Sequence, residues 1–351
     1  MKIQFFILFF LCCTVLGAGF LNDRIRPEGD MVIVKGGTFE MGDVFSEGNE
    51  SERPVHAVTL DDFYIGKYEI TVGEFRRFVD ETNFVTNAEQ SVNTEEQMKY
   101  IARVRELMQK DSQNKIEIYK TYRKVASFGG TNYWDPENNR WGFSTDYNWR
   151  NPGFVQTDDH PVQCISWDDA AGYCNWLSKK NNLPPAYNIE TGELLDEKGK
   201  VTNDISKVKG YRLPTEAEWE FAARERGRKV RFGNGKNIAN SQDICFDGSR
   251  GDYEYLQKSD KCKGTVPAGS FEPNSLGLYD MSGNAWEWCS DYMGTYESGS
   301  QINPYNSDGF RRILKGGRWG GSAAEIRIFT RYPYISNDRC NNSGFRIARS
   351  K

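Results

Sequence analysis

Short apolar runs interrupted by glycine form the first pattern along the chain. They begin at Met31 and occupy positions 32–34, 38–42, 58–60 and 63–65. Runs of this length, rich in β-branched and aromatic residues and bounded by glycine, predict β-strands joined by tight turns. The N-terminal part of the domain is therefore expected to begin with small sheets.

Apolar residues at helical spacing follow four capping motifs. In each motif the side chain of a Ser or Thr accepts from the backbone N–H three residues later, and the side chain of that later residue accepts from the backbone N–H of the Ser or Thr. The motifs begin at Thr71, Thr94, Ser166 and Thr215. Apolar side chains behind each of them recur on one helical face, so we expect four helices that bury this face in the core.

Two stretches differ in character from their surroundings. Residues 88–127 are charged and only weakly amphipathic, whereas residues 188–209 contain two Gly-containing turn signals that predict a protruding hairpin. Both are interpreted as insertions. Residues 210–351 are rich in Gly and Trp with few periodic runs, which predicts mostly irregular chain. Such chain needs ties, such as metal ions or disulfides, to stay compact.

The N-terminus has the layout of an export signal. Lys2 precedes an almost wholly apolar stretch, Ile3–Leu16, and the small residues 17–19 follow. The stretch is too short for a membrane span of about 20 residues and fits a signal peptide over residues 1–19. Two alternatives stay open: a lipoprotein site at Cys12 or Cys13, for which the preceding Leu is a poor fit, and an internal apolar helix.

We therefore expect a signal peptide (1–19), a polar tether (20–30) and a single domain (31–351). The charge is nearly balanced, with 45 basic and 49 acidic residues and a net of −4. Since nucleic-acid affinity depends on clustered Lys and Arg, no nucleic-acid partner is expected. The two histidines, His56 and His160, leave little room for imidazole-based metal sites or catalysis.

Six cysteines remain after the expected signal cleavage: Cys164, Cys174, Cys245, Cys262, Cys289 and Cys340. An even number in an exported chain allows disulfides, but six cysteines permit about 15 pairings that the sequence does not distinguish. Buried free thiols are the alternative. Abundant aromatics, 14 % of the chain, and 34 glycines indicate a loop-rich fold packed around large rings.

Seven motifs occur in one order along the mature chain. They are Gly36–Gly42, Glu69–Val72, Pro161–Val162 with Ser166–Ala170, Tyr211–Glu220, Gly277–Trp288, Gly316–Gly317 with Arg327, and Gly344–Arg346. This order resembles the formylglycine-generating-enzyme (sulfatase-modifying factor) family. The resemblance implies an α+β domain with the formylglycine-generating-enzyme variant of the C-type lectin fold, which has little regular secondary structure.

The loop from Asp280 to Glu287 has the composition of a calcium site. Two carboxylates lie close together in sequence, and Gly283 allows a turn that aims carbonyl oxygens inward. Calcium prefers about six to eight oxygen ligands. The family resemblance implies one structural ion held at Asp280, Gly283, Ala285 and Glu287. It implies a second at Asn240, Ser241, Asp260 and Cys262, where Ser241 and Cys262 would offer carbonyls.

The catalytic chemistry of the family is missing. The resemblance implies a cysteine pair that binds copper(I), five residues apart, shortly after the Gly-Gly of the core. Gly321 and Ile326 stand at those positions, and Arg318 replaces a serine of the family's oxygen pocket. Copper(I) requires soft thiolates, which Gly and Ile do not supply. We therefore expect no copper, no formylglycine generation and no enzyme activity of this kind.

The C-terminal segment is expected to form an aromatic-rich ligand groove. The positions predicted to point outward into it are Gly320, Gly321, Ser322, Ala324, Glu325, Ile326, Thr330, Tyr332, Tyr334, Ser336 and Asn341. Trp319, Arg327, Gly344 and Phe345 are expected to pack or tether the scaffold. Trp, Tyr and Arg are the usual anchors of binding sites. The segment also resembles the variable stretch of diversity-generating-retroelement display proteins, which ends in a similar Gly-Phe-Arg.

Three functions follow in order of preference. The first is a non-catalytic, exported, calcium-stabilised ligand-binding protein, in the narrower interpretation a retroelement-diversified display protein. The second is a structural lipoprotein of an envelope secretion or motility machine. The third is an enzyme with a rearranged active site. The expected partner is a protein, peptide or glycan ligand, the expected state a monomer, and the expected membrane link at most a lipid anchor.

Overall fold

The computed structural model describes residues 30–91, 95–96, 99, 102–103, 106–107 and 129–351. The expected signal peptide and tether, the capping motif at Thr94 and most of the insertion 88–127 lie outside the described residues. Within the described part, no helix combines the length and apolar character needed to cross a membrane.

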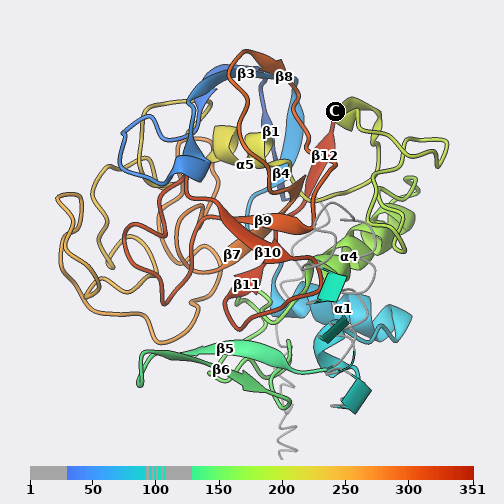
Figure 1. Cartoon of the computed structure of the whole chain (residues 1–351), viewed down its shortest axis with the longest axis horizontal. Helices are drawn as coiled ribbons and strands as arrows, with labels where there is room; N and C mark the ends of the chain where they lie inside the picture. The colour runs from blue at the N-terminus through green and yellow to red at the C-terminus, as the bar shows by residue number, and fades with distance from the viewer. Residues whose placement is uncertain (1–29, 92–94, 97–98, 100–101, 104–105, 108–128) are drawn as a thin grey trace, which may run out of the picture.

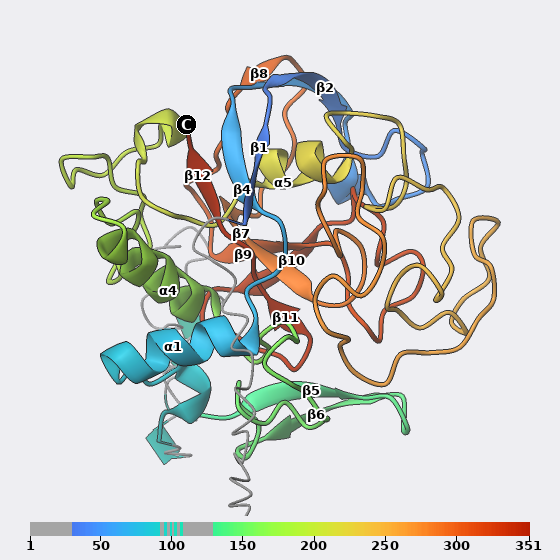
Figure 2. The same ribbon diagram turned by 180° about the vertical axis from the view of Figure 1, so that it is seen from behind.

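Twelve short strands form four small sheets, ordered β1-β4-β12, β10-β9-β7-β11, β2-β3-β8 and β5-β6 in the described part (Figures 1 and 2). The strands are β1 (Met31–Val34), β2 (Gly37–Met41), β3 (His56–Leu60), β4 (Phe63–Gly66), β5 (Thr131–Asp135), β6 (Arg140–Ser144), β7 (Trp286–Tyr292), β8 (Gln301–Ile302), β9 (Arg311–Lys315), β10 (Tyr332–Ile335), β11 (Ser343–Gly344) and β12 (Ala348–Ser350). The four strands predicted from apolar runs, β1 to β4, are confirmed. β12 pairs with β4, so the C-terminal end of the chain closes the sheet that the N-terminal strands begin.

Three α-helices begin where capping motifs predict them. They are α1 (Val72–Thr82), α4 (Trp167–Lys180) and α5 (Glu216–Ala223), and each has both hydrogen bonds of its capping box. Short 3-10 helices occupy η1 (Glu50–Glu52), η2 (Asn87–Glu89) and η3 (Ile205–Lys207). Since capping boxes act within four residues, they could be identified from the sequence alone.

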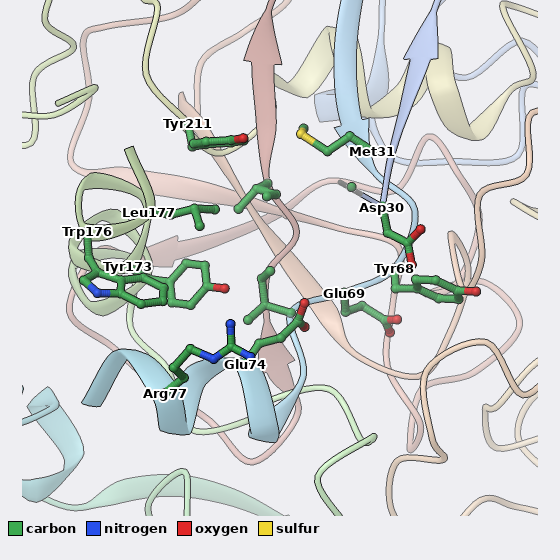
Figure 3. A pocket seen from close by; sticks show the side chains of 13 residues that line it. Asp30, Met31, Tyr68, Glu69, Glu74, Arg77, Tyr173, Trp176, Leu177 and Tyr211 are labelled. Atoms are coloured by element: carbon green, nitrogen blue, oxygen red, sulfur yellow. The ribbon is translucent and has the colours of Figure 1, made fainter. Parts of the chain in front are cut away.

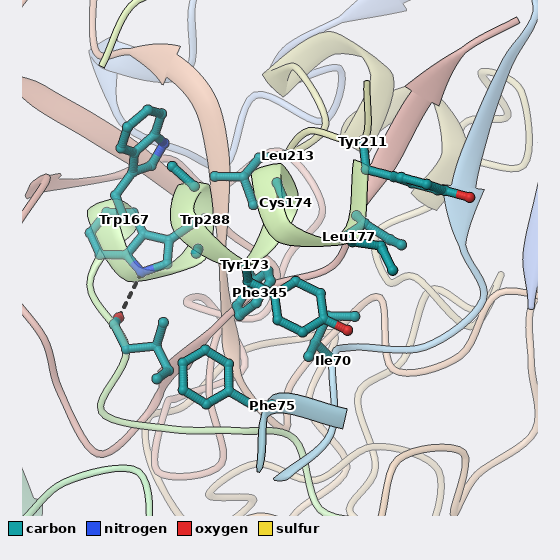
Figure 4. Packing of buried hydrophobic residues seen from close by; sticks show 14 of the residues in the cluster. Ile70, Phe75, Trp167, Tyr173, Cys174, Leu177, Tyr211, Leu213, Trp288 and Phe345 are labelled. Carbon is teal, nitrogen blue, oxygen red and sulfur yellow. Dashed lines mark hydrogen bonds between the residues drawn. The ribbon is translucent and has the colours of Figure 1, made fainter. Parts of the chain in front are cut away.

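Large aromatic side chains fill the main core (Figure 4). Phe75 from α1, Tyr173 from α4 and Phe345 from the C-terminal segment pack edge to face or stacked around one another. Trp288 lies in the same cluster, where its indole N–H donates to the carbonyl of Ile165 at 2.9 Å. Burying rings of this size contributes much of the stability of a fold with so little regular structure.

Long irregular segments connect these elements, as predicted for the C-terminal half. Between the end of α5 and the start of β7 the chain runs from 224 to 285 without a helix or strand. The expected hairpin at 188–209 is instead a pair of turns closed by single bridges, Tyr187 to Leu194 and Leu195 to Val201. Leu194 is buried, so this insertion is anchored to the core. The α+β class and the fold type are as predicted.

Candidate functional site

A cavity of about 350 Å³ lies beside the C-terminal segment. Four parts of the chain line it: the β5–β6 hairpin, the loop that contains Arg250, the sheet of β7, β9 and β10, and the irregular C-terminal segments on either side of β10. Its lining is mainly aromatic, charged or polar and includes Asn132, Trp141, Arg250, Trp286, Arg318, Glu325, Tyr332, Tyr334, Cys340 and Asn342. We call this cavity the C-terminal pocket.

The sheet presents the aromatic wall of the C-terminal pocket. Trp286 begins β7, and Tyr332 and Tyr334 lie on the edge strand β10, two positions apart and therefore on the same face. The rings of Trp286 and Tyr332 stack with centroids 5.3 Å apart and an interplanar angle of 25°. Tyr332 is 40 % exposed and Trp141, across the pocket on β6, is 49 % exposed. The pocket thus offers ring faces to a ligand.

A buried arginine lies among these rings. Arg318 is 4 % exposed, and its guanidinium lies 5.0 Å from the ring of Trp134 and 5.1 Å from that of Trp141. Its Nη2 is 3.6 Å from Oε1 of Glu325, which is beyond hydrogen-bond distance, and its Nη1 has no hydrogen-bond partner among the described residues. Arg250 adds a second guanidinium to the lining. The site is therefore positively charged and incompletely hydrogen-bonded.

Only part of the predicted groove lines this pocket. Of the eleven predicted positions, Glu325, Tyr332 and Tyr334 contribute to the lining. Gly320 and Gly321 are buried beneath it, and Ala324 is half-buried.

The expectation that the groove positions point outward is wrong for seven of them, which are buried: Gly320, Gly321, Ser322, Ile326, Thr330, Ser336 and Asn341. Ile326 packs in an apolar cluster with Phe232 and Ala323. The side-chain oxygen of Asn341 accepts from the backbone N–H of Trp134 at 2.9 Å and so ties the β5–β6 hairpin to the C-terminal segment.

The scaffold positions are buried as predicted: Trp319, Arg327, Gly344 and Phe345. Gly344 has no room for a side chain, because a Cβ there would lie 2.5 Å from the carbonyl oxygen of Val162. Trp141, Arg250 and Trp286 were not predicted as site residues. Trp141 and Arg250 lie far from the C-terminal segment in sequence, and no local pattern marks them. Trp286 belongs to the motif Gly277–Trp288, but that motif does not indicate that its ring lines a pocket.

The six cysteines that lie among the described residues are free thiols. Cys340 is the one that lines the C-terminal pocket, and burial raises its pKa to about 12, so the thiol stays protonated. Cys245 and Cys262 lie together, with a hydrogen bond between their side chains. The positions expected for the catalytic pair carry no sulfur: Ile326 is buried in apolar surroundings, and a Cβ at Gly321 would lie 2.8 Å from Oε2 of Glu325.

The first predicted calcium loop is tightly folded around buried carboxylates. Gly283 has φ +78°, and a Cβ there would lie 2.4 Å from the carbonyl oxygen of Cys245. Glu287 is fully buried, and Arg346 donates to both of its oxygens at 2.5 and 2.6 Å. One oxygen of Asp280 accepts from the backbone N–H of Gly269.

A third carboxylate, Glu69, lies near the other two. It is buried, and its Oε2 has no hydrogen-bond partner among the described residues. Burial, together with the neighbouring charges of Asp280 and Glu287, holds its pKa well above the usual range. Three carboxyl groups thus lie near one guanidinium, that of Arg346, and a bound cation there would favour the ionised form of Glu69.

The side chains in this region do not by themselves form a metal cage. Within the described ranges, no group of three or more His, Cys, Asp or Glu side chains is placed to hold a metal ion. A cation at this loop would therefore need backbone carbonyl oxygens as ligands, as the predicted set from Gly283 and Ala285 supposes. Glu69 also lines a cavity of about 60 Å³ between β1, α1 and α4 (Figure 3), which has room for little more than water.

The second predicted calcium region brings two irregular segments side by side. The amide of Asn240 donates to Gln257, and the backbone N–H of Ser241 donates to Ser259. The side-chain oxygen of Asn240 accepts from the backbone N–H of Gln242. Asn240 therefore has partners at both ends of its amide, and this region fits a cation less well than the loop at Asp280.

A larger hollow of about 790 Å³ opens beside the ends of β7 and β8. Its buried charged lining residues, Glu216, Asp291 and Arg331, already have partners. Glu216 receives two hydrogen bonds from Arg331, and Asp291 accepts from the backbone N–H groups of Glu216 and Asn306. This hollow therefore offers fewer free polar groups than the C-terminal pocket.

Comparison with known proteins places the chain in a family. The model of the sulfatase-modifying factor enzyme 1-like domain matches residues 19–351, and the chain belongs to this family. The formylglycine-generating enzyme of Bos taurus is 28 % identical, over 93 % of this chain and 76 % of the relative. The inactive C-alpha-formylglycine-generating enzyme 2 of Bos taurus is 29 % identical, over 91 % of this chain and 87 % of the relative.

Among solved structures, Treponema denticola variable protein 1 has the same fold. It superposes with a TM-score of 0.58 at 23 % sequence identity and covers 92 % of this chain and 95 % of its own. The family thus contains proteins described as active enzymes and proteins described as inactive, so membership alone does not decide between catalysis and binding.

Proposed function

We propose that this chain is a non-catalytic ligand-binding protein that uses the C-terminal pocket. The observation that carries the proposal is the composition of that pocket: ring faces from Trp141, Trp286 and Tyr332, guanidinium groups, and a single protonated thiol. Aromatic and arginine side chains in a concave site are the usual means of binding, whereas a thiol pair is absent from the two positions where the family's chemistry needs one.

The residues present do not fit the family's copper ion. Gly321 supplies no donor atom, and Ile326 lies among apolar side chains. Carboxylates and amides near the pocket do not replace thiolates as copper(I) ligands. The same conclusion is supported by two similar members of the family, from Bos taurus and Mus musculus, that are described as inactive.

The residues at the loop of Asp280 fit a calcium ion better. We propose that the ion binds there as a structural tie, with Asp280, Glu287 and the carbonyls of Gly283 and Ala285 as ligands and Glu69 close by. The buried, unpartnered oxygen of Glu69 and the excess of carboxyl groups over guanidinium groups support this. Export of the chain, which would give it access to extracellular calcium, belongs to the same proposal.

Display of a variable binding surface is the narrower form of this function. The likeness to a protein named as variable supports it only at the level of fold. Among the eleven predicted positions, those at the pocket or the surface, Ala324, Glu325, Tyr332 and Tyr334, are the ones where change would alter recognition without disturbing the core. A neighbouring reverse transcriptase gene, with a template copy that differs only at adenines, would support display. A neighbourhood without both features would contradict it.

The experiment for the non-catalytic function uses the family's own reaction. The copper-treated, full-length chain is incubated with a cysteine-containing sulfatase peptide, and the peptide is examined by mass spectrometry. We expect no change in mass at the cysteine, with an active formylglycine-generating enzyme as the positive control. Conversion of the cysteine would overturn the proposal.

A further inference from the structure

Arg318 differs from every other buried arginine in the described part of the chain. Eight arginines are buried there, and the other seven each donate at least one hydrogen bond to a carboxylate or carbonyl oxygen: Arg212, Arg224, Arg312, Arg327, Arg331, Arg339 and Arg346. Besides its contacts with the rings of Trp134 and Trp141, the guanidinium of Arg318 has the ion pair with Glu325 at 3.6 Å, and no hydrogen bond from it to a described residue is seen. Since a buried guanidinium without acceptors is costly, its place in a pocket points to an acceptor supplied from outside.

A second unpartnered donor lies in the same cavity. The side-chain nitrogen Nδ2 of Asn342 is buried and has no hydrogen-bond partner among the described residues, and Asn342 is 2 % exposed. Asn342 and Arg318 both line the C-terminal pocket. Two buried donors, at the two ends of the C-terminal segment, therefore lack acceptors within one cavity.

The charge of the pocket also favours an anion. Two guanidinium groups, Arg250 and Arg318, face one carboxylate, Glu325, which leaves one positive charge in excess. Glu325 is itself turned toward the backbone, where its Oε2 accepts from the N–H of Ser322 at 2.7 Å. It therefore neutralises Arg318 only weakly.

The remaining walls define the rest of the ligand. The stacked rings of Trp286 and Tyr332, with Tyr334 6.0 Å from Tyr332, form a continuous aromatic surface beside the two donors. Trp141 faces the pocket from the β5–β6 hairpin. A volume of about 350 Å³ admits a group about the size of one amino-acid side chain together with its carboxylate.

We propose that the C-terminal pocket is a receptor site for an aromatic carboxylate, whose anionic group binds Arg318 and Asn342 and whose ring stacks on Tyr332. This inference rests on the proposed function and specifies its ligand class. The acid can be a free small molecule or the C-terminal aromatic residue of a peptide. Arg250 adds attraction at the rim, and Glu325 disfavours dianions.

The test compares acids with their neutral counterparts on the full chain. Phenylacetate is titrated against phenylacetamide, and a peptide that ends in Phe with a free carboxylate is titrated against its C-terminal amide, with tryptophan fluorescence and calorimetry as readouts. We expect each binding acid to exceed its amide by about tenfold or more in affinity. If only phenylacetate binds, the ligand is a free small acid; if only the peptide acid binds, the ligand is the C-terminal residue of a peptide. Equal binding of acid and amide, or no binding of either acid at millimolar concentration, would overturn the proposal.

Matched variants locate the site. Arg318→Met should weaken phenylacetate binding by about tenfold or more, whereas Arg311→Met, an exposed arginine that does not line the pocket, should change it by less than about twofold. If Arg318→Met does not fold, Arg250→Met and the acid–amide comparison on the unmodified chain decide. Glucuronate binding in place of the aromatic acids would overturn the aromatic part of the proposal and indicate an acidic saccharide.

The outcomes separate this inference from the proposed function. A neutral ligand that binds the unmodified chain and is lost in Tyr332→Ala, but not in Arg318→Met, would overturn the carboxylate inference and leave the binding function intact. Formylglycine generation from the sulfatase peptide would overturn the binding function itself.

Discussion

Arg331 and Arg318 are both buried arginines of the C-terminal half, and their surroundings differ. Arg331 lies in a network beneath α5, where Glu216 accepts two of its hydrogen bonds and two backbone carbonyls accept more. Lys315 and Glu220 form a further buried pair in that network. Arg318 lies over aromatic rings with one distant carboxylate. Because its hydrogen bonds are satisfied within the protein, Arg331 belongs to the scaffold. Arg318, whose guanidinium lacks such partners, can bind a ligand.

The same substitution at both arginines tests whether Arg318 differs from Arg331 in its contribution to stability. Arg331→Met leaves Glu216 buried without its main partner, so we expect a loss of about 3–5 kcal/mol in the free energy of unfolding. Arg318→Met removes only a weak ion pair and some packing on Trp134, and we expect a change of about 1 kcal/mol or less. Urea unfolding of both variants measures the two values. Equal losses would show that Arg318 also belongs to the scaffold.

The irregular chain between α5 and β7 offers a second comparison, with the hydrogen-bonded sheets. The neighbouring thiols of Cys245 and Cys262 lie in this segment. We expect oxidation to join them, and closing a loop of this length stabilises a fold by about 3 kcal/mol. Mass spectrometry of peptides from the non-reduced protein should find the 245–262 link, and Cys245→Ser should remove the stabilisation. A Cys245 partner other than Cys262 would contradict the arrangement seen here.

Calcium removal tests whether the loop at Asp280 is tied by an ion or by Arg346 alone. If calcium binds the folded state, it stabilises by about 2.7 kcal/mol at a concentration one hundred times its dissociation constant, and chelation should lower the melting temperature. Asp280→Asn should abolish most of this dependence. Glu287 is a poorer target, because its removal also leaves Arg346 without its carboxylate.

Glu272→Gln provides the control for the calcium experiment, since Glu272 is an exposed acid of the preceding segment. It should keep the full response to chelator. A melting curve that does not respond to chelator, together with elemental measurement of no bound calcium, would remove the proposed ion from this loop.

Local signals made the elements of this fold predictable. Capping boxes at Thr71, Ser166 and Thr215 fix helix starts through hydrogen bonds within four residues, and glycine-bounded apolar runs mark β1 to β4. The fold class was predicted from the ordered family motifs. The β5–β6 hairpin carries no such motif, and it went unpredicted although it supplies Trp141 to the pocket.

Long-range contacts explain what the sequence did not show at the site. The segment 318–342 is largely irregular, so no period of two or 3.6 separates inward from outward side chains. Ile326, Ser336 and Asn341 are buried because distant segments cover them. Arg318 was identifiable only as a departure from the family's serine, and its lack of partners depends on the positions of residues far along the chain.

The pH dependence of the free energy of unfolding distinguishes the scaffold, which contains a titrating carboxyl group, from the C-terminal pocket. Asp291, in the scaffold beside Glu216, has its pKa raised to about 7, chiefly by burial, while the backbone N–H groups of Glu216 and Asn306 oppose the shift. Folding therefore holds a proton on Asp291 that the unfolded chain releases. This contribution is full below about pH 4, the usual pKa of an unfolded Asp, and is lost progressively as pH rises to the folded pKa of about 7. Between pH 6.5 and 8 we expect Asp291 to lower the free energy of unfolding by about 1 kcal/mol.

The difference between the profiles of the unmodified chain and Asp291→Asn isolates this group, since every other titration is shared. In Asp291, each carboxyl oxygen accepts from one backbone N–H group, whereas the amide of Asn offers only one acceptor oxygen. The free energy of unfolding of Asp291→Asn should therefore be lower throughout, but it should fall less steeply as pH rises. Ligand binding at the C-terminal pocket should not follow the same profile, because Asp291 does not line that pocket. A parallel pair of stability profiles would show that Asp291 is ionised in the fold, and the scaffold's charge balance would then need another cation near Glu216.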